Sequence, residues 1–203
     1  IRAHVAGKRG QDGVPLLRAA LAYLAARPAP RLVAVGGLQG TGKSWLARRI
    51  APALGAAPGA VVLRSDETRK RLAGVPPETR LPAEAYTPEA NAAVFAELQA
   101  RAREALAAGH SVILDAMFQR PAEREAVAAL HPGFTGLWLR APMEVLRARV
   151  AARRGDASDA TPAILEAAAA RDPGPLDWHM LDATHDAAPE AMKALDLPPP
   201  PSP

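Results

Sequence analysis

The sequence has 203 residues, a formal net charge of +4 and no cysteine. The length suits one well-buried domain, and the lack of cysteine excludes disulfides, thiolate metal sites and cysteine nucleophiles. Apolar residues make up 49% of the chain and aromatic residues only 4%, which indicates a globular protein with alanine-rich helices packed on aliphatic strands. The small positive charge suits an anionic ligand such as a nucleotide, a phosphorylated metabolite or a nucleic acid.

Residues 1–30 are expected to form a linker helix that precedes the main domain. Apolar positions at helical spacing occupy 15–27, and Pro28 and Pro30 then end the helix. The chain begins with Ile1 and not with methionine, which indicates a trimmed chain or a piece of a longer polypeptide. No apolar run approaches the roughly 20 residues needed to cross a bilayer and no signal peptide is evident, which favours a cytoplasmic protein without a membrane partner.

Residues 31–197 alternate short apolar strands with helices. The strands are expected at 32–35, 61–63, 112–114, 137–139 and 178–181. The helices are expected at 43–54, 88–109 with Thr87 as N-cap, 121–130, 142–154, 162–170 and 188–195. This alternation predicts an α/β fold with a five-stranded parallel sheet flanked by helices on both faces. The proline-rich residues 198–203 are expected to be disordered.

A phosphate-binding loop follows the first strand and opens the next helix. The pattern G-x-x-x-x-G-K-[ST] is matched by Gly37, Leu38, Gln39, Gly40, Thr41, Gly42, Lys43 and Ser44. Its glycines let backbone N–H groups point at phosphates, and the helix N-terminus adds partial positive charge. We assign these residues and Trp45 to nucleotide binding, with Lys43 on the β- and γ-phosphates and Ser44 on Mg²⁺. An accidental glycine-rich turn is the alternative.

The second strand is followed by Asp66, our candidate catalytic base. The carboxyl ends of parallel strands converge near the phosphate loop, so this carboxylate is expected to face the γ-phosphate and take a proton from an acceptor hydroxyl. A helix cap is the other interpretation of Asp66. Arg69 lies one turn further on and is expected to hold an anionic group of the acceptor. Lys70 and Arg71 are interpreted as a solvated charge run.

The third strand ends in Asp115, as a Walker B strand does, which favours a role in holding Mg²⁺ over a simple turn. Residues 149–162 are expected to form an arginine-rich helical lid. Arg149 and Arg153 share one helix face, where they would contact the nucleotide, and Arg153 would neutralise charge on the transferred phosphoryl group. For Arg147 and Arg154, a place on a solvent-exposed basic helix face is as good an interpretation as a role in the lid.

The combined motifs resemble those of the AAA_33-type P-loop kinases, which are related to zeta toxins, gluconate kinase and the kinase domain of polynucleotide kinase. The resemblance covers residues 30–185, including Arg64-Ser65-Asp66 and Gly155-Asp156-Ala157-Ser158-Asp159-Ala160. It is strongest to the form fused behind aminoglycoside-phosphotransferase-like domains, which implies that residues 1–28 link to such a partner. The resemblance to polynucleotide kinase implies that Asp66 is the base and that Arg69 contacts an acceptor phosphate.

The function favoured by these features is a P-loop kinase that uses ATP and Mg²⁺ to phosphorylate a hydroxyl acceptor. The acceptor is a small molecule or a nucleic-acid 5′ end, although no basic track with stacking aromatic residues is evident in the sequence. A nucleotide-binding regulatory or ATPase module without its own acceptor, and a zeta-toxin-like sugar-nucleotide kinase, are the alternatives. ATP is preferred to GTP on the family resemblance alone.

Overall fold

The computed structural model describes residues 2–25, 28–152 and 158–198. Its strands are β1 (Leu32–Gly37), β2 (Val61–Arg64), β3 (Val112–Asp115), β4 (Phe134–Arg140) and β5 (His179–Asp182). Its α-helices are α1 (Arg2–Lys8), α2 (Val14–Ala25), α3 (Lys43–Ile50), α4 (Ser65–Leu72), α5 (Pro88–Ala107), α6 (Pro121–Ala128), α7 (Met143–Ala152), α8 (Pro162–Ala169) and α9 (Ala188–Ala194). Short 3₁₀ helices occur at Ala51–Ala53 and Ala83–Tyr86.

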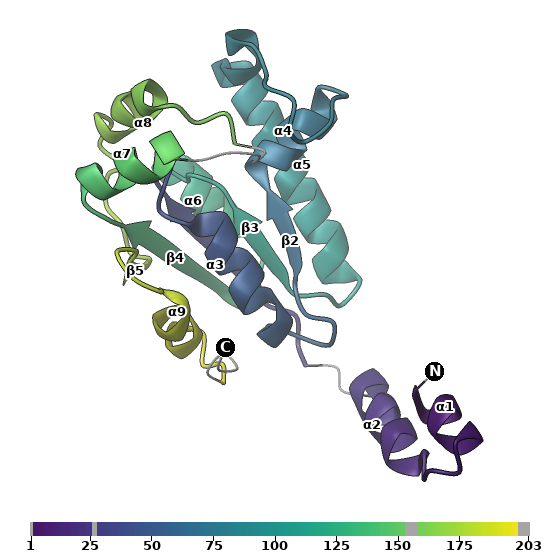
Figure 1. The fold of residues 1–203 in the computed structure, drawn as a ribbon. Helices are drawn as coiled ribbons and strands as arrows, with labels where there is room; N and C mark the ends of the chain where they lie inside the picture. The colour runs from purple at the N-terminus through teal and green to yellow at the C-terminus, as the bar shows by residue number, and fades with distance from the viewer. Residues whose placement is uncertain (1, 26–27, 153–157, 199–203) are drawn as a thin grey trace.

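The strands form one five-stranded parallel sheet, as predicted, and their order is β2-β3-β1-β4-β5. The register places Asp115, the last residue of β3, between Val35 of β1 and Arg64 of β2. Because parallel strands end at the same edge, the segments that follow β1, β2 and β3 meet there. Figure 1 shows α4, α7 and α8 beyond this edge of the sheet.

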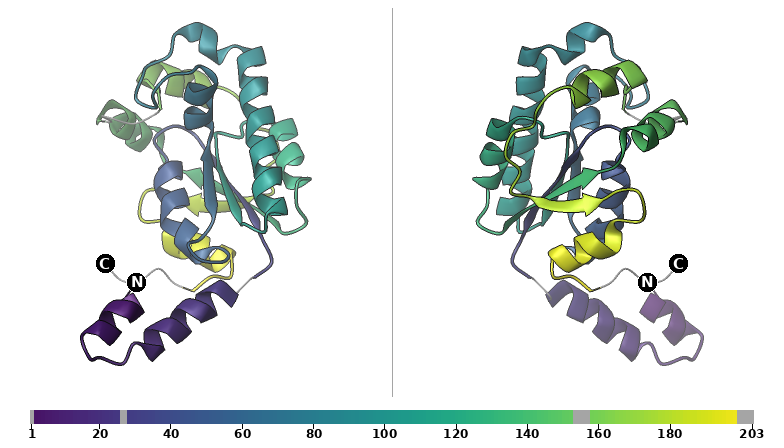
Figure 2. Two further views of the ribbon diagram at one scale, coloured as in Figure 1. Left: turned by 90° about the vertical axis from the view of Figure 1, so that its right-hand side faces the viewer. Right: turned by 90° about the vertical axis from the view of Figure 1, so that its left-hand side faces the viewer.

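Helices cover both faces of the sheet (Figures 1 and 2). On one face α3 and α9 pack against alternate strand residues such as Val33 and Val35. On the other face α5 packs against Ala34 and Leu114, through an apolar stripe of Val94, Leu98, Ala102 and Leu106. The two predicted layers of helix around one sheet are therefore confirmed.

Most predicted elements are confirmed with small shifts of their ends. Thr87 caps α5, since its hydroxyl accepts from the N–H of Ala90 at 3.2 Å. The helix expected over 43–54 ends at Ile50, because Pro52 has no N–H to donate and the chain tightens into a 3₁₀ turn. Helix α1 and the 3₁₀ helix Ala83–Tyr86 were not predicted, since both are too short to show a clear apolar period.

Helices α1 and α2 lie apart from the sheet in Figures 1 and 2. The expected helix at 15–27 appears as α2, ending at Ala25. Large apolar side chains of this pair are exposed, with Leu17 at 53% and Leu21 at 55%. In the described part of the chain, no helix is long and apolar enough to cross a membrane.

An aromatic cluster centred on Trp178 packs against one face of β4. Its ring lies edge-on to Phe118 at 5.2 Å, Phe134 at 5.7 Å and Trp138 at 6.3 Å between ring centroids. The indole rests directly on Gly136 of β4, where a Cβ atom would lie 2.3 Å from the ring. The lack of a side chain at Gly136 is therefore a packing requirement.

We expect Gly136→Ala to destabilise the fold by about 1–3 kcal/mol, because the added methyl overlaps the buried indole. In thermal unfolding this corresponds to a fall in Tm of roughly 2–12 °C for a chain of this size. Gly7→Ala is the matched control, since nothing lies within 4 Å of a Cβ at that helical position. An unchanged Tm in Gly136→Ala would contradict the close packing of Trp178 on this strand.

Candidate active site

The phosphate loop joins β1 to α3 and is shaped by glycines in the left-handed region. Gly37 has φ 131° and Gly40 has φ 84°. A Cβ at Gly37 would lie 2.4 Å from the carbonyl oxygen of Leu139, so the loop passes too close to β4 for any side chain. The hydroxyl of Thr41 donates to the carbonyl of Leu38 at 2.8 Å and holds the turn. The loop is thus built from β1 into the first turn of α3.

Lys43 and Ser44 open helix α3 and point to the edge where the strands end. The ammonium of Lys43 donates to the carbonyl of Leu38 at 2.8 Å, so the side chain lies over the loop. The hydroxyl of Ser44 hydrogen-bonds to the Asp115 carboxylate, with 2.5 Å between Oγ and Oδ2. The structure therefore joins Ser44 and Asp115, the two residues that the sequence predicted as metal contacts.

The Ser44 and Asp115 oxygens fit a magnesium ion. Mg²⁺ prefers oxygen ligands and is usually held by one or two protein groups together with water and substrate phosphates. In the described part of the chain no group of three acidic or histidine side chains could hold a metal ion. The remaining ligands would therefore come from a bound triphosphate and from water.

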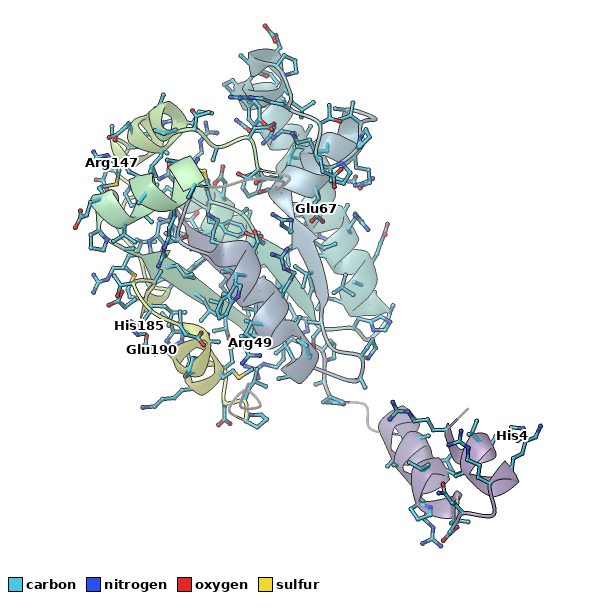
Figure 3. The ribbon with its side chains drawn as sticks, in the orientation of Figure 1. His4, Arg49, Glu67, Arg147, His185 and Glu190 are labelled. Atoms are coloured by element: carbon cyan, nitrogen blue, oxygen red, sulfur yellow. The ribbon has the colours of Figure 1, made fainter. Side chains whose placement is uncertain are left out.

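Arg64 is a buried partner of Asp115 that the sequence did not single out. Its Nε lies 3.3 Å from Asp115 Oδ2, and its Nη1 lies 2.7 Å from Oε1 of Glu67. The β2–β3 register places Arg64 and Asp115 side by side, which is why the ion pair forms at this point. Figure 3 labels Glu67, which is about half exposed at the outer end of this chain of contacts.

Asp66 is the second residue of α4 and not its N-cap, so the capping interpretation is wrong. The side chain is half-buried, and this burial together with the negative charge of Asp115 raises its pKa above the ordinary value of 3.8. Lys43, Arg64 and a hydrogen bond from Ser158 oppose that rise. A carboxylate with a raised pKa beside a lysine of the phosphate loop is typical of a functional site.

Arg69 lies one turn after Asp66 and is buried with 9% exposure. Its Nη1 donates to the carbonyl of Ala85 at 2.6 Å and its Nη2 to Oδ1 of Asn91 at 2.7 Å. The guanidinium also lies 4.7 Å from the ring centroid of Tyr86. Its Nε is buried without a hydrogen-bond partner, and burial lowers the pKa of the group. All its direct partners among the described residues are uncharged.

One cavity of about 680 Å³ joins these two sets of residues. The side of the phosphate loop is lined by Gln39, Gly40, Gly42, Lys43, Ser44, Trp45 and Arg48. The same cavity is also lined by Asp66, Arg69, Tyr86, Asn91, Phe95, Met117, Gln119, Ser158 and residues of α8. Trp45, which is 49% exposed, is among the residues that line the cavity.

The buried polar atoms that lack a partner gather at this cavity. Among the described residues they are Oε1 of Gln39, Nε of Arg69 and Oε1 of Gln119, and all three residues line the cavity. A buried polar atom without a hydrogen bond typically costs about 1–3 kcal/mol. Such a cost is tolerated where a ligand makes the missing hydrogen bonds.

The expected lid is described only in part. Arg149 of α7 donates to the carbonyl of Ala183 at 2.7 Å and lies 3.4 Å from the carbonyl of Gly40, so it reaches the phosphate loop from outside the cavity. Arg147 is exposed at the outer side of α7 (Figure 3) and pairs with Glu166 of α8 at 2.5 Å, which confirms its place on a solvent face. Arg153 and Arg154 lie outside the described residues.

Lys70 corrects the sequence-based interpretation of a solvated charge run. Its side chain is 1% exposed and pairs with Asp159 at 2.5 Å, whereas Arg71 is half exposed and pairs with Glu97. The partner of Lys70 lies 89 positions away in the sequence, so no local pattern shows that this lysine is buried. Asn91 and Gln119 were also missed, since single amides carry no signal in a sequence.

The fold and the loop define a P-loop protein of the kinase-like architecture. A family model described as an AAA domain, AAA_33, matches residues 32–173, and the chain belongs to this family. The uncharacterized protein Rv2004c of Mycobacterium tuberculosis is 37% identical over 163 residues, which cover 75% of this chain but 31% of that protein. The chain thus spans less than a third of the length of the curated relatives it matches.

Solved structures share the same fold. A sugar kinase from Janibacter sp. HTCC2649 is 22% identical with a TM-score of 0.63, covering 84% of this chain and 96% of that one. The Mycobacterium tuberculosis APS kinase CysC, in complex with AMPPNP and APS, is 18% identical with a TM-score of 0.59, covering 83% and 97%. At identities this low, the structural similarity establishes the fold alone. The roles of individual residues must be argued from the geometry of the site.

The raised pKa of Asp66 predicts how its charge affects stability. Above 3.8 the unfolded chain loses this proton before the folded protein does, so stability falls as pH rises from 3.8 through the folded pKa. Asp66→Asn is therefore expected to raise Tm near neutral pH, and this gain should shrink as the pH falls toward 3.8.

Asp182→Asn is the control for this prediction. Backbone and side-chain hydrogen bonds from Thr184 lower the pKa of exposed Asp182, so its neutralisation should leave Tm unchanged or slightly lower at neutral pH. Thermal unfolding across this pH range measures both variants. A fall in Tm in Asp66→Asn at neutral pH would show that the ionised carboxylate stabilises the fold, which is the opposite of the predicted effect.

Proposed function

We propose that this chain is an ATP-dependent phosphotransferase that moves the γ-phosphate to a hydroxyl acceptor. The observation that carries the proposal is that the phosphate loop and Asp66 line the same cavity of about 680 Å³. A triphosphate on the loop would therefore present its last phosphate to the carboxylate. A kinase needs this arrangement, whereas a module that only binds nucleotide does not.

The donor side would work by positioning and by charge neutralisation. Backbone N–H groups of the loop would hold the phosphates, and Lys43 would leave the Leu38 carbonyl to contact the β- and γ-phosphates. Mg²⁺, held by Ser44 and Asp115, would neutralise charge on the phosphates. Arg149 and Arg153 are proposed to add positive charge from the lid. The similar fold of the APS kinase, which was solved with AMPPNP, supports ATP as the donor.

The acceptor side would supply the base. The acceptor oxygen attacks the γ-phosphorus as its proton passes to the Asp66 carboxylate, and the bond to the β-phosphate oxygen breaks to release ADP. The base is active only when ionised, so transfer should decline as the pH falls through the raised pKa of Asp66. A carboxylate suffices because phosphoryl transfer depends more on orientation than on basicity.

Arg69 favours an acceptor that carries a negative group. A buried guanidinium normally has a carboxylate or phosphate partner, since an isolated buried charge is costly. The direct partners of Arg69 in the described chain are neutral, and its Nε is unpaired. Against the lowering by burial, the nearby charges of Asp66 and Asp159 act to raise the pKa of Arg69, and an anionic acceptor would add a direct counter-charge one helical turn from the base. The size of the cavity, which must also admit the triphosphate, favours a small acceptor.

Residues 1–30 are proposed to connect this domain to a preceding one. The exposed leucines of α2 would be covered by a neighbouring domain, and the relatives that match this chain are about three times longer than the matched part. The residues proposed above for phosphoryl transfer all lie within residues 31–197, and the preceding domain would contribute none of them.

The test is transfer of the γ-phosphate from labelled ATP, with Mg²⁺, to a panel of small anionic alcohols and 5′-hydroxyl oligonucleotides. We expect Asp66→Asn to lower kcat by about 10²- to 10⁴-fold, the usual contribution of a general base. The nucleotide Kd should change by less than about threefold, since this residue contacts the acceptor and not the triphosphate in the ground state.

Glu67→Gln is the matched control, because it neutralises the neighbouring carboxylate on the same helix and leaves an amide to contact Arg64. It should retain most of the wild-type kcat. Transfer to no acceptor by the wild-type protein, together with tight ATP binding, would favour a nucleotide-sensing module. Transfer only to oligonucleotides would support the kinase proposal and contradict the proposal that the acceptor is a small molecule.

A further inference from the structure

A buried ion pair lies at the wall of the proposed site, where Asp159 lines the cavity and Lys70 lies behind it. Lys70 of α4 has a side chain that is 1% exposed, and its ammonium lies 2.5 Å from Oδ2 of Asp159. It also donates a hydrogen bond to the carbonyl of Thr79. Apolar residues at such buried positions usually stabilise a fold at least as much as an ion pair does. A buried ion pair therefore suggests that the segments it joins must be held in a defined position.

The same Asp159 oxygen gathers three separate segments of the chain. Besides Lys70 it accepts from the backbone N–H of Leu81 at 3.1 Å and from the hydroxyl of Tyr86. These donors come from α4, from the loop after it and from the 3₁₀ helix Ala83–Tyr86, whereas Asp159 lies between α7 and α8. The carboxylate therefore fastens the segment before α8 onto the acceptor side of the cavity.

Ser158, the residue before this anchor, interacts with Asp66 through its side chain, which lowers the pKa of that carboxyl. Both residues line the cavity. An aspartate side chain at the start of a helix can take several χ1 and χ2 rotamers unless a neighbour selects one of them. A hydroxyl held beside the carboxylate limits the rotamers that it can take and still leaves oxygen lone pairs for an acceptor hydroxyl.

We infer that Ser158 is a positioning residue for the Asp66 base, and that the Lys70–Asp159 ion pair holds Ser158 in place. This inference rests on the proposed function, in which Asp66 accepts the proton. Ser158 need not touch the acceptor or the nucleotide to act. Its effect is on the orientation of the carboxylate, so it should appear in kcat and not in the binding of either substrate.

The first arm of the test measures the anchor without any assay of transfer. Amide hydrogen exchange of Leu81 in the nucleotide-free protein reports its hydrogen bond to Asp159. Asp159→Asn should speed this exchange by about tenfold or more. Because that variant leaves Lys70 charged and buried, the double variant Lys70→Met with Asp159→Asn is measured beside it and should show the same faster exchange with less loss of Tm.

The second arm measures Ser158 by kinetics. We expect Ser158→Ala to lower kcat by about 10- to 100-fold while the nucleotide Kd and the acceptor KM stay within about threefold. Ser158→Thr, which keeps the hydroxyl, should restore most of kcat. Thr161→Ala is the matched control, because it removes a hydroxyl of the same segment that caps α8 by accepting from the N–H of Ile164.

The outcomes separate this inference from the proposed function. If the wild-type protein transfers phosphate and Ser158→Ala retains full kcat, the positioning role is overturned. Equal losses of kcat, substrate binding and Tm in Ser158→Ala would show a structural role only and overturn it too. If the wild-type protein transfers nothing, the proposed function fails. Unchanged Leu81 exchange in both Asp159 variants overturns the anchor in either case.

Discussion

The arrangement of this site depends on the contacts made by the buried carboxylate of Asp115. Three strands end around it, and it accepts from Ser44 at 2.5 Å and from Arg64 at 3.3 Å. A buried charge must be paired, so the serine after β1 and the arginine at the end of β2 are both drawn to the end of β3. This fixes the phosphate loop and helix α4 relative to one another, and with them Lys43 and Asp66.

Asp66 shows the conflict between stability and function that this geometry creates. Burial and the nearby charge of Asp115 raise its pKa, so the ionised form disfavours the folded state at neutral pH. Arg69 adds a second unfavourable group, a buried cation whose Nε lacks a partner. Unfavourable charges gathered in one cavity are typical of sites arranged for a ligand rather than for stability.

Local features of the sequence predicted the fold and the donor side well. Apolar runs and the glycine pattern predicted the five strands and the loop, because each depends on neighbouring residues. The closeness of Ser44 and Asp115 could also be predicted, since Asp115 ends one strand and Ser44 lies just after the adjacent one. Residues whose roles depend on distant partners were not predicted: Lys70 is buried only because Asp159 lies opposite it, and Gly136 is required only because Trp178 covers it.

The central claim, that donor and acceptor meet in one cavity between Lys43 and Asp66, is tested most directly by a crystal structure with AMPPNP and Mg²⁺. We predict the γ-phosphate on Lys43, the metal on Ser44 and Asp115, and a water or hydroxyl within about 3–3.5 Å of both the Asp66 carboxylate and the γ-phosphorus. A γ-phosphate that points away from Asp66, with the cavity between them closed, would contradict this claim.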